Sequence, residues 1–141
     1  MAKVNNCIHG ENLRKEWANF PITYQMGNIG SEVSRSLKWT EKGNKVRAAK
    51  AIDRALELFD FTISANIKNH ARLTEILKAR EEFCDYFFGG NSWHTDPAKM
   101  QKYYDDFVIM SQIAMERSDN KNECIRGVMH SFWLPGLDSH R

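Results

Sequence analysis

Apolar side chains recur every three or four residues over residues 21–39, near the start of the chain. The positions are Ile22, Met26, Ile29, Val33 and Leu37. This spacing places them on one face of an α-helix, and such a face packs into a core. Proline suits the first turn of a helix, so the helix should begin at Pro21 and form the scaffold for the rest of the chain.

Two glycines, Gly27 and Gly30, lie inside this predicted helix. An interior glycine destabilises a helix by about 1 kcal/mol relative to alanine. Close approach of a second helix would compensate for this loss. The alternative is that both glycines are tolerated at the surface.

Three further helices are predicted by the same periodicity. Gly43 and Asn44 end the first helix and cap the second, which covers residues 45–64. After a turn over residues 65–69, a third helix turns apolar side chains from Leu73 to Phe87 inward and stops at paired glycines. An Asp-Pro pair at residue 96 caps and starts the fourth. The connections are short, so neighbouring helices should be antiparallel.

These elements predict an all-α fold, an antiparallel up-and-down four-helix bundle. An irregular N-terminal arm would occupy residues 1–20, the bundle residues 21–117 and a C-terminal tail residues 118–141. A chain of 141 residues fits a single domain. It has no apolar run near 18 residues, and its first residues lack the apolar centre of a secretion signal. We therefore expect a cytoplasmic protein that does not enter a membrane.

Three cysteines, Cys7, Cys84 and Cys124, are widely spaced and form no Cys-x-x-Cys pair. This is typical of reduced thiols rather than of a disulfide framework. Cys7 with His9 and Cys124 with His130 fit no standard zinc spacing. No metal site and no cofactor are expected from these residues.

Carboxylates in the pattern Glu-x-x-Asp occur twice, at Glu57 with Asp60 and at Glu82 with Asp85. Paired carboxylates on two helices are ligands that Mg²⁺ uses in helical enzymes. Glu82 lies nearly opposite the apolar face of its helix, however, and Asp85 lies well off that face. The sequence therefore favours solvated surface acids over a magnesium site.

Arg80 falls on the apolar face of the third helix. A guanidinium keeps its charge when buried, so a carboxylate should meet it. The candidates are Glu32 on the first helix and Asp53, Glu57 or Asp60 on the second, with Asp60 nearest the apolar face. The alternative is an arginine whose stem is buried and whose head reaches water.

Charge is distributed unevenly. Residues 35–54 hold seven basic and two acidic side chains, a local net charge of +5, and residues 81–106 hold six acids and two lysines, a local net charge of −4. A basic helix end beside Trp39 could contact phosphates and stack a base. The alternatives are solvated helix ends, or basic and acidic ends that meet in an oligomer.

We expect a binding site where the polar flank of the first helix faces the second and third helices, together with this basic end. The candidate binding residues are Glu32, Arg35, Lys38, Trp39, Asp53, Asp60 and Arg80. No catalytic residue is assigned.

Four segments carry a resemblance to a known group: NFPITYQMGNIGSEVSRSLKW, KAIDRALELFDFTI, RLTEILKAREEFCDYFFGG and YYDDF. Over residues 17–115 the chain resembles small prokaryotic four-helix proteins of uncharacterised role. Their fold is similar to that of HEPN proteins and of the helical substrate-binding partners of nucleotidyltransferases. The resemblance implies a helical bundle that dimerises and accompanies a nucleotidyltransferase or a nucleic acid.

Two functional hypotheses follow. The first is a non-catalytic interaction module that self-associates as a dimer or binds another protein, with Leu58 and Phe61 on the outer side of the second helix as its apolar contact. The second is a HEPN-like enzyme directed at RNA or nucleotides. Its nearest motif is Arg126 with His130, whose three intervening residues depart from the four to six of RNA-cleaving HEPN proteins.

Overall fold

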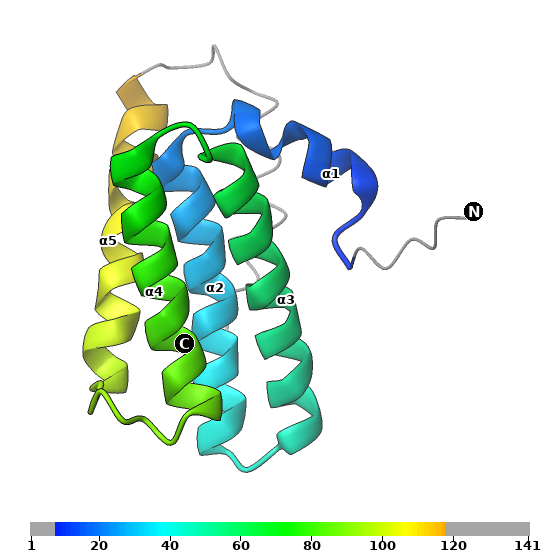
Figure 1. Cartoon of the computed structure of the whole chain (residues 1–141), viewed down its shortest axis with the longest axis vertical. Helices are drawn as coiled ribbons and strands as arrows, with labels where there is room; N and C mark the ends of the chain where they lie inside the picture. The colour runs from blue at the N-terminus through cyan, green and yellow to red at the C-terminus, as the bar shows by residue number, and fades with distance from the viewer. Residues whose placement is uncertain (1–7, 118–141) are drawn as a thin grey trace.

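The computed structural model describes residues 8–117, and among these residues it contains five α-helices, one 3-10 helix and no strand. The elements are α1 (Glu11–Glu16), η1 (Trp17–Asn19), α2 (Ile22–Glu41), α3 (Lys45–Ala65), α4 (His70–Phe88) and α5 (Pro97–Arg117). The four long helices α2 to α5 run alternately up and down (Figure 1). The all-α prediction is confirmed. The four-helix bundle is not confirmed, because the N-terminal arm contributes a fifth helix.

The helix ends follow local capping rules. Pro21 is the N-cap of α2 rather than its first residue, because its ψ of 154° is extended. Asn44 caps α3 as predicted, since its side chain accepts a hydrogen bond from the backbone N–H of Arg47 at 3.1 Å. Asn69 caps α4 in the same way, so α4 begins at His70, directly after the predicted turn over residues 65–69. In the part of the chain that the structure describes, no helix is both long and apolar enough to span a bilayer.

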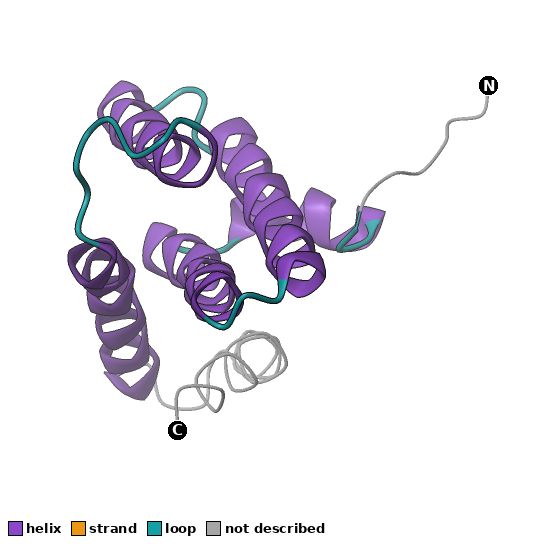
Figure 2. Cartoon of the chain, turned by 90° about the horizontal axis from the view of Figure 1, so that it is seen from below, coloured by secondary structure: helices purple, strands orange, loops and turns teal. Residues whose placement is uncertain are grey.

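Helix α2 occupies the centre of the molecule. Its most extensive contacts are with α3 and α5, and α4 packs mainly on α3 (Figure 2). The predicted apolar face supplies Met26, Ile29 and Val33 to the core, where aromatic side chains such as Phe59 and Phe83 are also buried. Polar residues of α2 are buried as well, so this helix is enclosed on more than its apolar face.

Gly30 marks the closest approach between α2 and α5. A Cβ atom added at Gly30 would lie 2.4 Å from Cβ of Tyr104, far inside van der Waals contact. Close helix approach was one of the two explanations for the glycines of α2, and it holds at Gly30. Gly27 is buried. Tyr104 is likewise buried, and burial raises the pKa of its hydroxyl well above the ordinary value.

The N-terminal arm docks through Trp17, which is fully buried. Its indole N–H donates to the Thr62 hydroxyl at 2.9 Å. Gln25 of α2 donates to the carbonyls of Trp17 and Phe20 at 2.8 and 2.9 Å, and accepts from Asn66 at 2.9 Å. These bonds join the arm to both central helices.

The docked arm also overturns one expectation. Leu58 and Phe61 were predicted to face outward, but their side chains are only 1% and 4% exposed. Phe61 packs edge-on against Trp17, with the guanidinium of Arg14 over its ring at 5.9 Å. The arm was expected to be irregular, yet Arg14 of α1 and Trp17 of η1 pack on Phe61. Leu58 is buried within the core cluster. These two residues therefore belong to the core and offer no docking surface.

Substituting Gly30 by alanine tests the close approach. The new methyl group would force α2 and α5 apart, and we expect a loss of roughly 1–3 kcal/mol in the free energy of unfolding. The intrinsic helix propensity of alanine favours the opposite sign. Urea denaturation followed by circular dichroism measures the difference, with Glu81→Ala, an exposed site in α4, as the control. A variant as stable as the parent protein would show that the helices do not meet at Gly30.

Candidate functional site

Four residues at the turn between α2 and α3 form what we call the basic tip: Lys38, Trp39, Lys42 and Arg47. The amino groups of Lys38 and Lys42 lie 5.0 and 5.9 Å from the centre of the Trp39 ring, and the guanidinium of Arg47 lies 4.7 Å from it. Three cations therefore surround one partly exposed indole. Each contact is favourable by about 0.5–1 kcal/mol at an exposed site, whereas the cations repel one another.

The turn itself brings these residues together. Lys38 and Lys42 flank Trp39 along the last turns of α2, and Gly43, with a φ of 76°, reverses the chain. Asn44 then caps α3, which places Arg47 in its first turn. Within residues 8–117, neither Lys42 nor Arg47 has an ion-pair partner. Lys42 and Arg47 therefore add positive charge that no ion pair in the described part of the chain compensates.

A groove of about 710 Å³ opens beside the basic tip. Lys38 and Lys42 stand on its α2 side, Tyr86 of α4 contributes an aromatic wall, and Gln101 comes from the first turns of α5. Glu41 also lines the groove, so its charge is mixed but remains positive overall at the α2 side.

Glu32 is buried between α2 and α3, at 5% exposure, and forms ion pairs with two arginines. It accepts hydrogen bonds from Arg35 at 2.8 Å and from Arg54 at 3.2 Å. Arg80 is therefore not its partner. A buried carboxylate with two guanidinium groups leaves a net positive charge, so this cluster adds to the positive potential near the tip.

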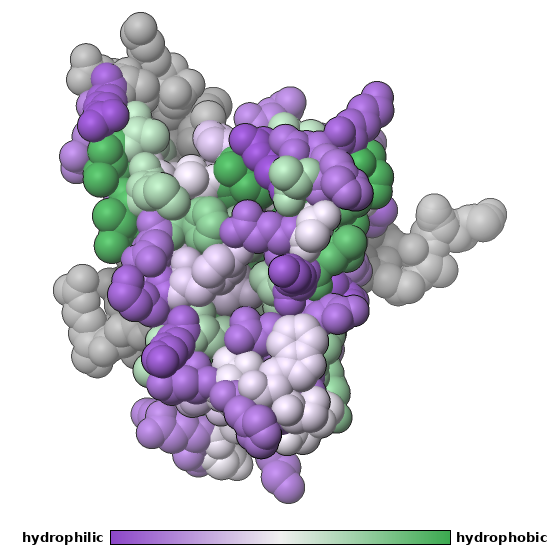
Figure 3. All heavy atoms as spheres, turned by 60° about the vertical axis from the view of Figure 1, so that its left-hand side comes forward, coloured by the Kyte–Doolittle hydropathy of each residue, from purple (hydrophilic) through white to green (hydrophobic). Residues whose placement is uncertain are grey.

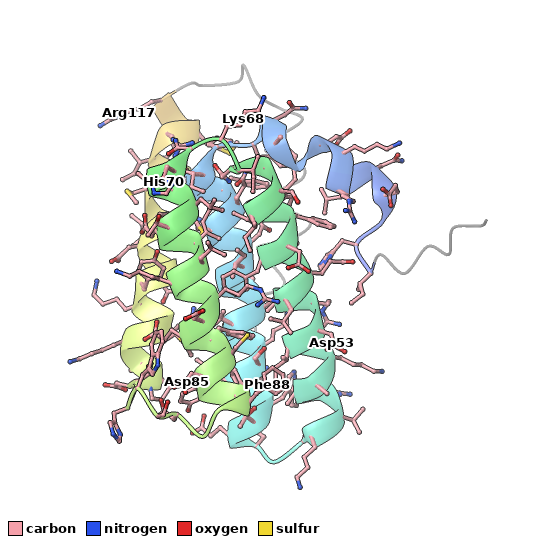
Figure 4. The ribbon with its side chains drawn as sticks, in the orientation of Figure 1. Asp53, Lys68, His70, Asp85, Phe88 and Arg117 are labelled. Carbon is pink, nitrogen blue, oxygen red and sulfur yellow. The ribbon has the colours of Figure 1, made fainter. Side chains whose placement is uncertain are left out.

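Arg80 forms its ion pair with Asp60, the candidate that the sequence placed nearest the apolar face. The Nε to Oδ1 distance is 3.7 Å, and the two side chains are 36% and 66% exposed. The pair is at the surface, where such interactions contribute little stability. Asp53 is exposed on the outer side of α3 (Figure 4).

The predicted site residues thus divide into separate groups. Lys38 and Trp39 belong to the basic tip, Glu32 and Arg35 form the buried cluster with Arg54, and the remaining three lie elsewhere on α3 and α4. The sequence did not indicate Arg54, although it lies in the same basic stretch. Arg47 belongs to the basic helix end that the sequence predicted, although it was not among the candidate binding residues.

From the sequence, the segment between α4 and α5 was predicted only to be a connecting loop. In the structure, hydrogen bonds to Asp85 hold this loop in place. Asp85 accepts from the hydroxyl of Ser92 at 2.6 Å and from the backbone N–H groups of Ser92 and Trp93 at 3.1 and 3.0 Å. These bonds favour the ionised carboxylate and lower the pKa of Asp85. Asp85 lies near the end of α4 that leads into this loop (Figure 4).

This loop adjoins two hollows between α4 and α5, of about 340 and 400 Å³, which share Glu82, Trp93 and Tyr103. The Tyr103 hydroxyl donates to Glu75 at 2.7 Å, and the Thr95 hydroxyl donates to Glu82 at 3.0 Å. Burial and both carboxylates raise the pKa of Tyr103. An aromatic residue in the polar segment GGNSWHTDP was the one sequence signal for this feature.

The Glu57 carboxylate of α3 binds the N-terminal arm. It accepts from the backbone N–H groups of Ile8 and His9 at 2.7 and 2.9 Å, and the His9 ring lies 2.6 Å from it. Among the residues that the structure describes, no group of three or more His, Cys, Asp or Glu side chains could hold a metal ion. Cys84 is a free thiol. Cys7, Cys124, Arg126 and His130 lie outside the described residues.

Comparison of the chain with protein-family models, with curated proteins and with solved structures found no match.

Protonating Asp85 should loosen the loop. Its pKa is lowered in the folded state, so its stabilising effect is present above the unfolded pKa of about 3.9 and is lost as the pH falls through the lower folded value. We expect the amide NMR signals of Ser92 and Trp93 to titrate together below pH 4. Asp85→Asn should abolish this titration, and Asp53→Asn should leave it unchanged. A midpoint at or above the ordinary aspartate value would contradict the hydrogen-bonded arrangement.

Proposed function

We propose that the protein is a non-catalytic helical interaction module that binds single-stranded nucleic acid through its basic tip. The observation that carries this proposal is the convergence of Lys38, Lys42 and Arg47 on the Trp39 indole. Proteins that bind single strands without sequence preference combine cationic side chains for the phosphates with aromatic rings for the bases. The basic tip supplies both within five residues on either side of Gly43.

The same geometry suggests how binding proceeds. A base stacks on the face of Trp39 and displaces one cation, and the displaced cation moves to a neighbouring phosphate. Mutual repulsion among the three cations favours this exchange, because each phosphate relieves it. The positive charge of the Glu32, Arg35 and Arg54 cluster lies in the adjoining part of α2 and α3 and attracts the same strand.

This proposal predicts a specific pattern of mutational effects. Trp39→Ala should weaken binding of a fluorescein-labelled 12-nucleotide oligouridylate by roughly 5- to 150-fold, because stacking contributes about 1–3 kcal/mol per base. Trp39→Phe should retain most of the affinity. Lys42→Gln should lower the slope of log affinity against log salt concentration by about 0.7. Fluorescence anisotropy over a salt series measures all three.

The control is Lys68→Gln, since Lys68 lies at the end of the molecule opposite the turn between α2 and α3 (Figure 4). It should leave both the affinity and the salt slope unchanged. Failure to bind the oligonucleotide at 50 mM salt would refute the proposal, as would equal affinity of the parent protein and a folded Trp39→Ala variant.

Self-association is a second candidate, supported by a different surface from the one that the sequence indicated. Ile109, Met110 and Ile113 are about half exposed on α5, away from the side that buries Met100 and Tyr104. Ile109 and Ile113 are one turn apart, so they form a continuous apolar contact that a second copy could cover. We propose that a homodimer forms through this side of α5.

Charged substitutions on α5 test the dimer. Ile109→Glu with Ile113→Glu should shift the mass measured by light scattering from that of two chains toward that of one, because burying two carboxylates in an apolar contact is unfavourable. Ile67→Glu, at an exposed apolar site in the turn between α3 and α4, should have no effect. A monodisperse monomer of the parent chain at high concentration would exclude self-association.

Two proposals rest on the resemblance alone. One is a nucleotidyltransferase as protein partner, and the other is HEPN-like RNA- or nucleotide-directed chemistry. The second depends on Arg126 and His130, so Arg126→Ala and His130→Ala, singly and together, should reduce any nuclease activity of the full chain. Unchanged activity in the double variant would rule out this motif.

A further inference from the structure

We propose that the hollow between α4 and α5 binds an organic cation, a guanidinium or alkylammonium group, between Trp93 and Tyr103 and beside Glu75 and Glu82. We call this site the α4–α5 groove. It consists of the two adjoining hollows of about 340 and 400 Å³. Figure 3 looks onto the side of the molecule that carries α4 and α5, where weakly polar and apolar side chains lie between more polar columns.

Trp93 is the first reason for this proposal. Its side chain is 52% exposed, although the loop that carries it is held by many hydrogen bonds. Asn91 and His94, on either side of it, have φ values of 55° and 54°, in the left-handed region that is unfavourable for most side chains. Asparagine and histidine adopt this region more readily than most residues, so the loop can hold the indole at the mouth of the hollow.

The charged side chains that line the groove determine whether it favours a positive or a negative ligand. Glu75 and Glu82 both line the groove, and burial together with these carboxylates raises the pKa of the Tyr103 hydroxyl, so the ring beside them is neutral. Lys78 and Lys99 also line the two hollows, but Asp96 joins the two glutamates there, so the acidic side chains outnumber the lysines by one. A cation is therefore favoured over an anion of the same size.

The carboxylates retain the capacity to accept further hydrogen bonds. Glu75 receives one from Tyr103 and Glu82 one from Thr95, and each ionised carboxylate has about four acceptor positions. These two bonds also fix the carboxylates in place before a ligand arrives. A planar guanidinium can donate to them while its face stacks on an aromatic ring, and an ammonium can do so as a point charge.

The site is distinct from the basic tip in its residues and in its charge. None of the side chains that line it belongs to the tip or to the cluster around Glu32. A cation in the α4–α5 groove and a phosphate at the tip could therefore be bound at the same time. The failure of one proposal would leave the other unaffected.

The test uses the full chain labelled with ¹⁵N. Its four tryptophans give four indole N–H signals, and Trp93→Phe identifies the one from Trp93 by its loss. We expect butylguanidinium to shift the Trp93 signal to saturation, whereas butylurea, which is neutral and of the same shape, should not. Equal shifts with the two compounds, or no shift with butylguanidinium at 50 mM, would overturn the proposal.

Two glutamates next to each other in α4 provide a matched pair of variants. Glu82→Gln keeps an oxygen for the Thr95 hydroxyl but removes the charge, and it should weaken butylguanidinium binding roughly five- to tenfold. Glu81→Gln, at an exposed position that lines neither hollow, should change nothing. Equal affinity of the parent protein and a Glu82→Gln variant with an unchanged circular dichroism spectrum would also overturn the proposal.

A second comparison identifies the source of the cation. N-acetyl-arginine amide presents the guanidinium alone, and a blocked Gly-Arg-Gly peptide presents it on a chain. Binding of the peptide at least tenfold more tightly would indicate an arginine side chain of a protein partner. Equal binding would indicate a small free cation.

Discussion

The structure depends on the satisfaction of polar groups that α2 carries into the interior. A buried polar group without a partner destabilises a protein by several kilocalories per mole, so each one dictates what must lie next to it. Gln25 requires the arm and the end of α3, and Glu32 requires arginines from α2 and α3. Ser36 instead bonds within the helix, to the carbonyl of Glu32. Helix α2 therefore holds the arm and α3 in place by hydrogen bonds. It holds α5 by close packing, which is possible because Gly30 has no side chain.

Both candidate surfaces lie toward the same end of the molecule. The turn between α2 and α3 and the loop between α4 and α5 are neighbours there (Figure 1). One is positive and built around Trp39, and the other is negative and built around Trp93. The two sites thus place an aromatic side chain among charges of opposite balance, with lysines and an arginine around Trp39 and more acids than lysines around Trp93.

The long helices could be predicted because their signals are local: a repeating apolar face, an asparagine cap, or a glycine after the last turn. The arm could not, since α1 has six residues and its stability comes from Trp17 against α3 rather than from any period of its own. Phe61 was misassigned for the same reason, because Trp17 packs on its ring. The groove at Trp93 was missed because Asp85, Ser92 and Tyr103 meet only through the fold, whereas the residues of the basic tip all lie in one basic stretch of the sequence, residues 35–54.

The contact at Gly30 also says something about how this sequence can change. Every residue except glycine carries a Cβ atom, so no side chain can enter position 30 while any side chain remains at position 104 in the same place. The two positions are coupled across 74 residues of chain and must be replaced together, or α5 must move. A distant relative could therefore carry the small residue at position 104 of α5 and the larger one at position 30 of α2. Such a pair would identify the relative even where little else of the sequence is shared.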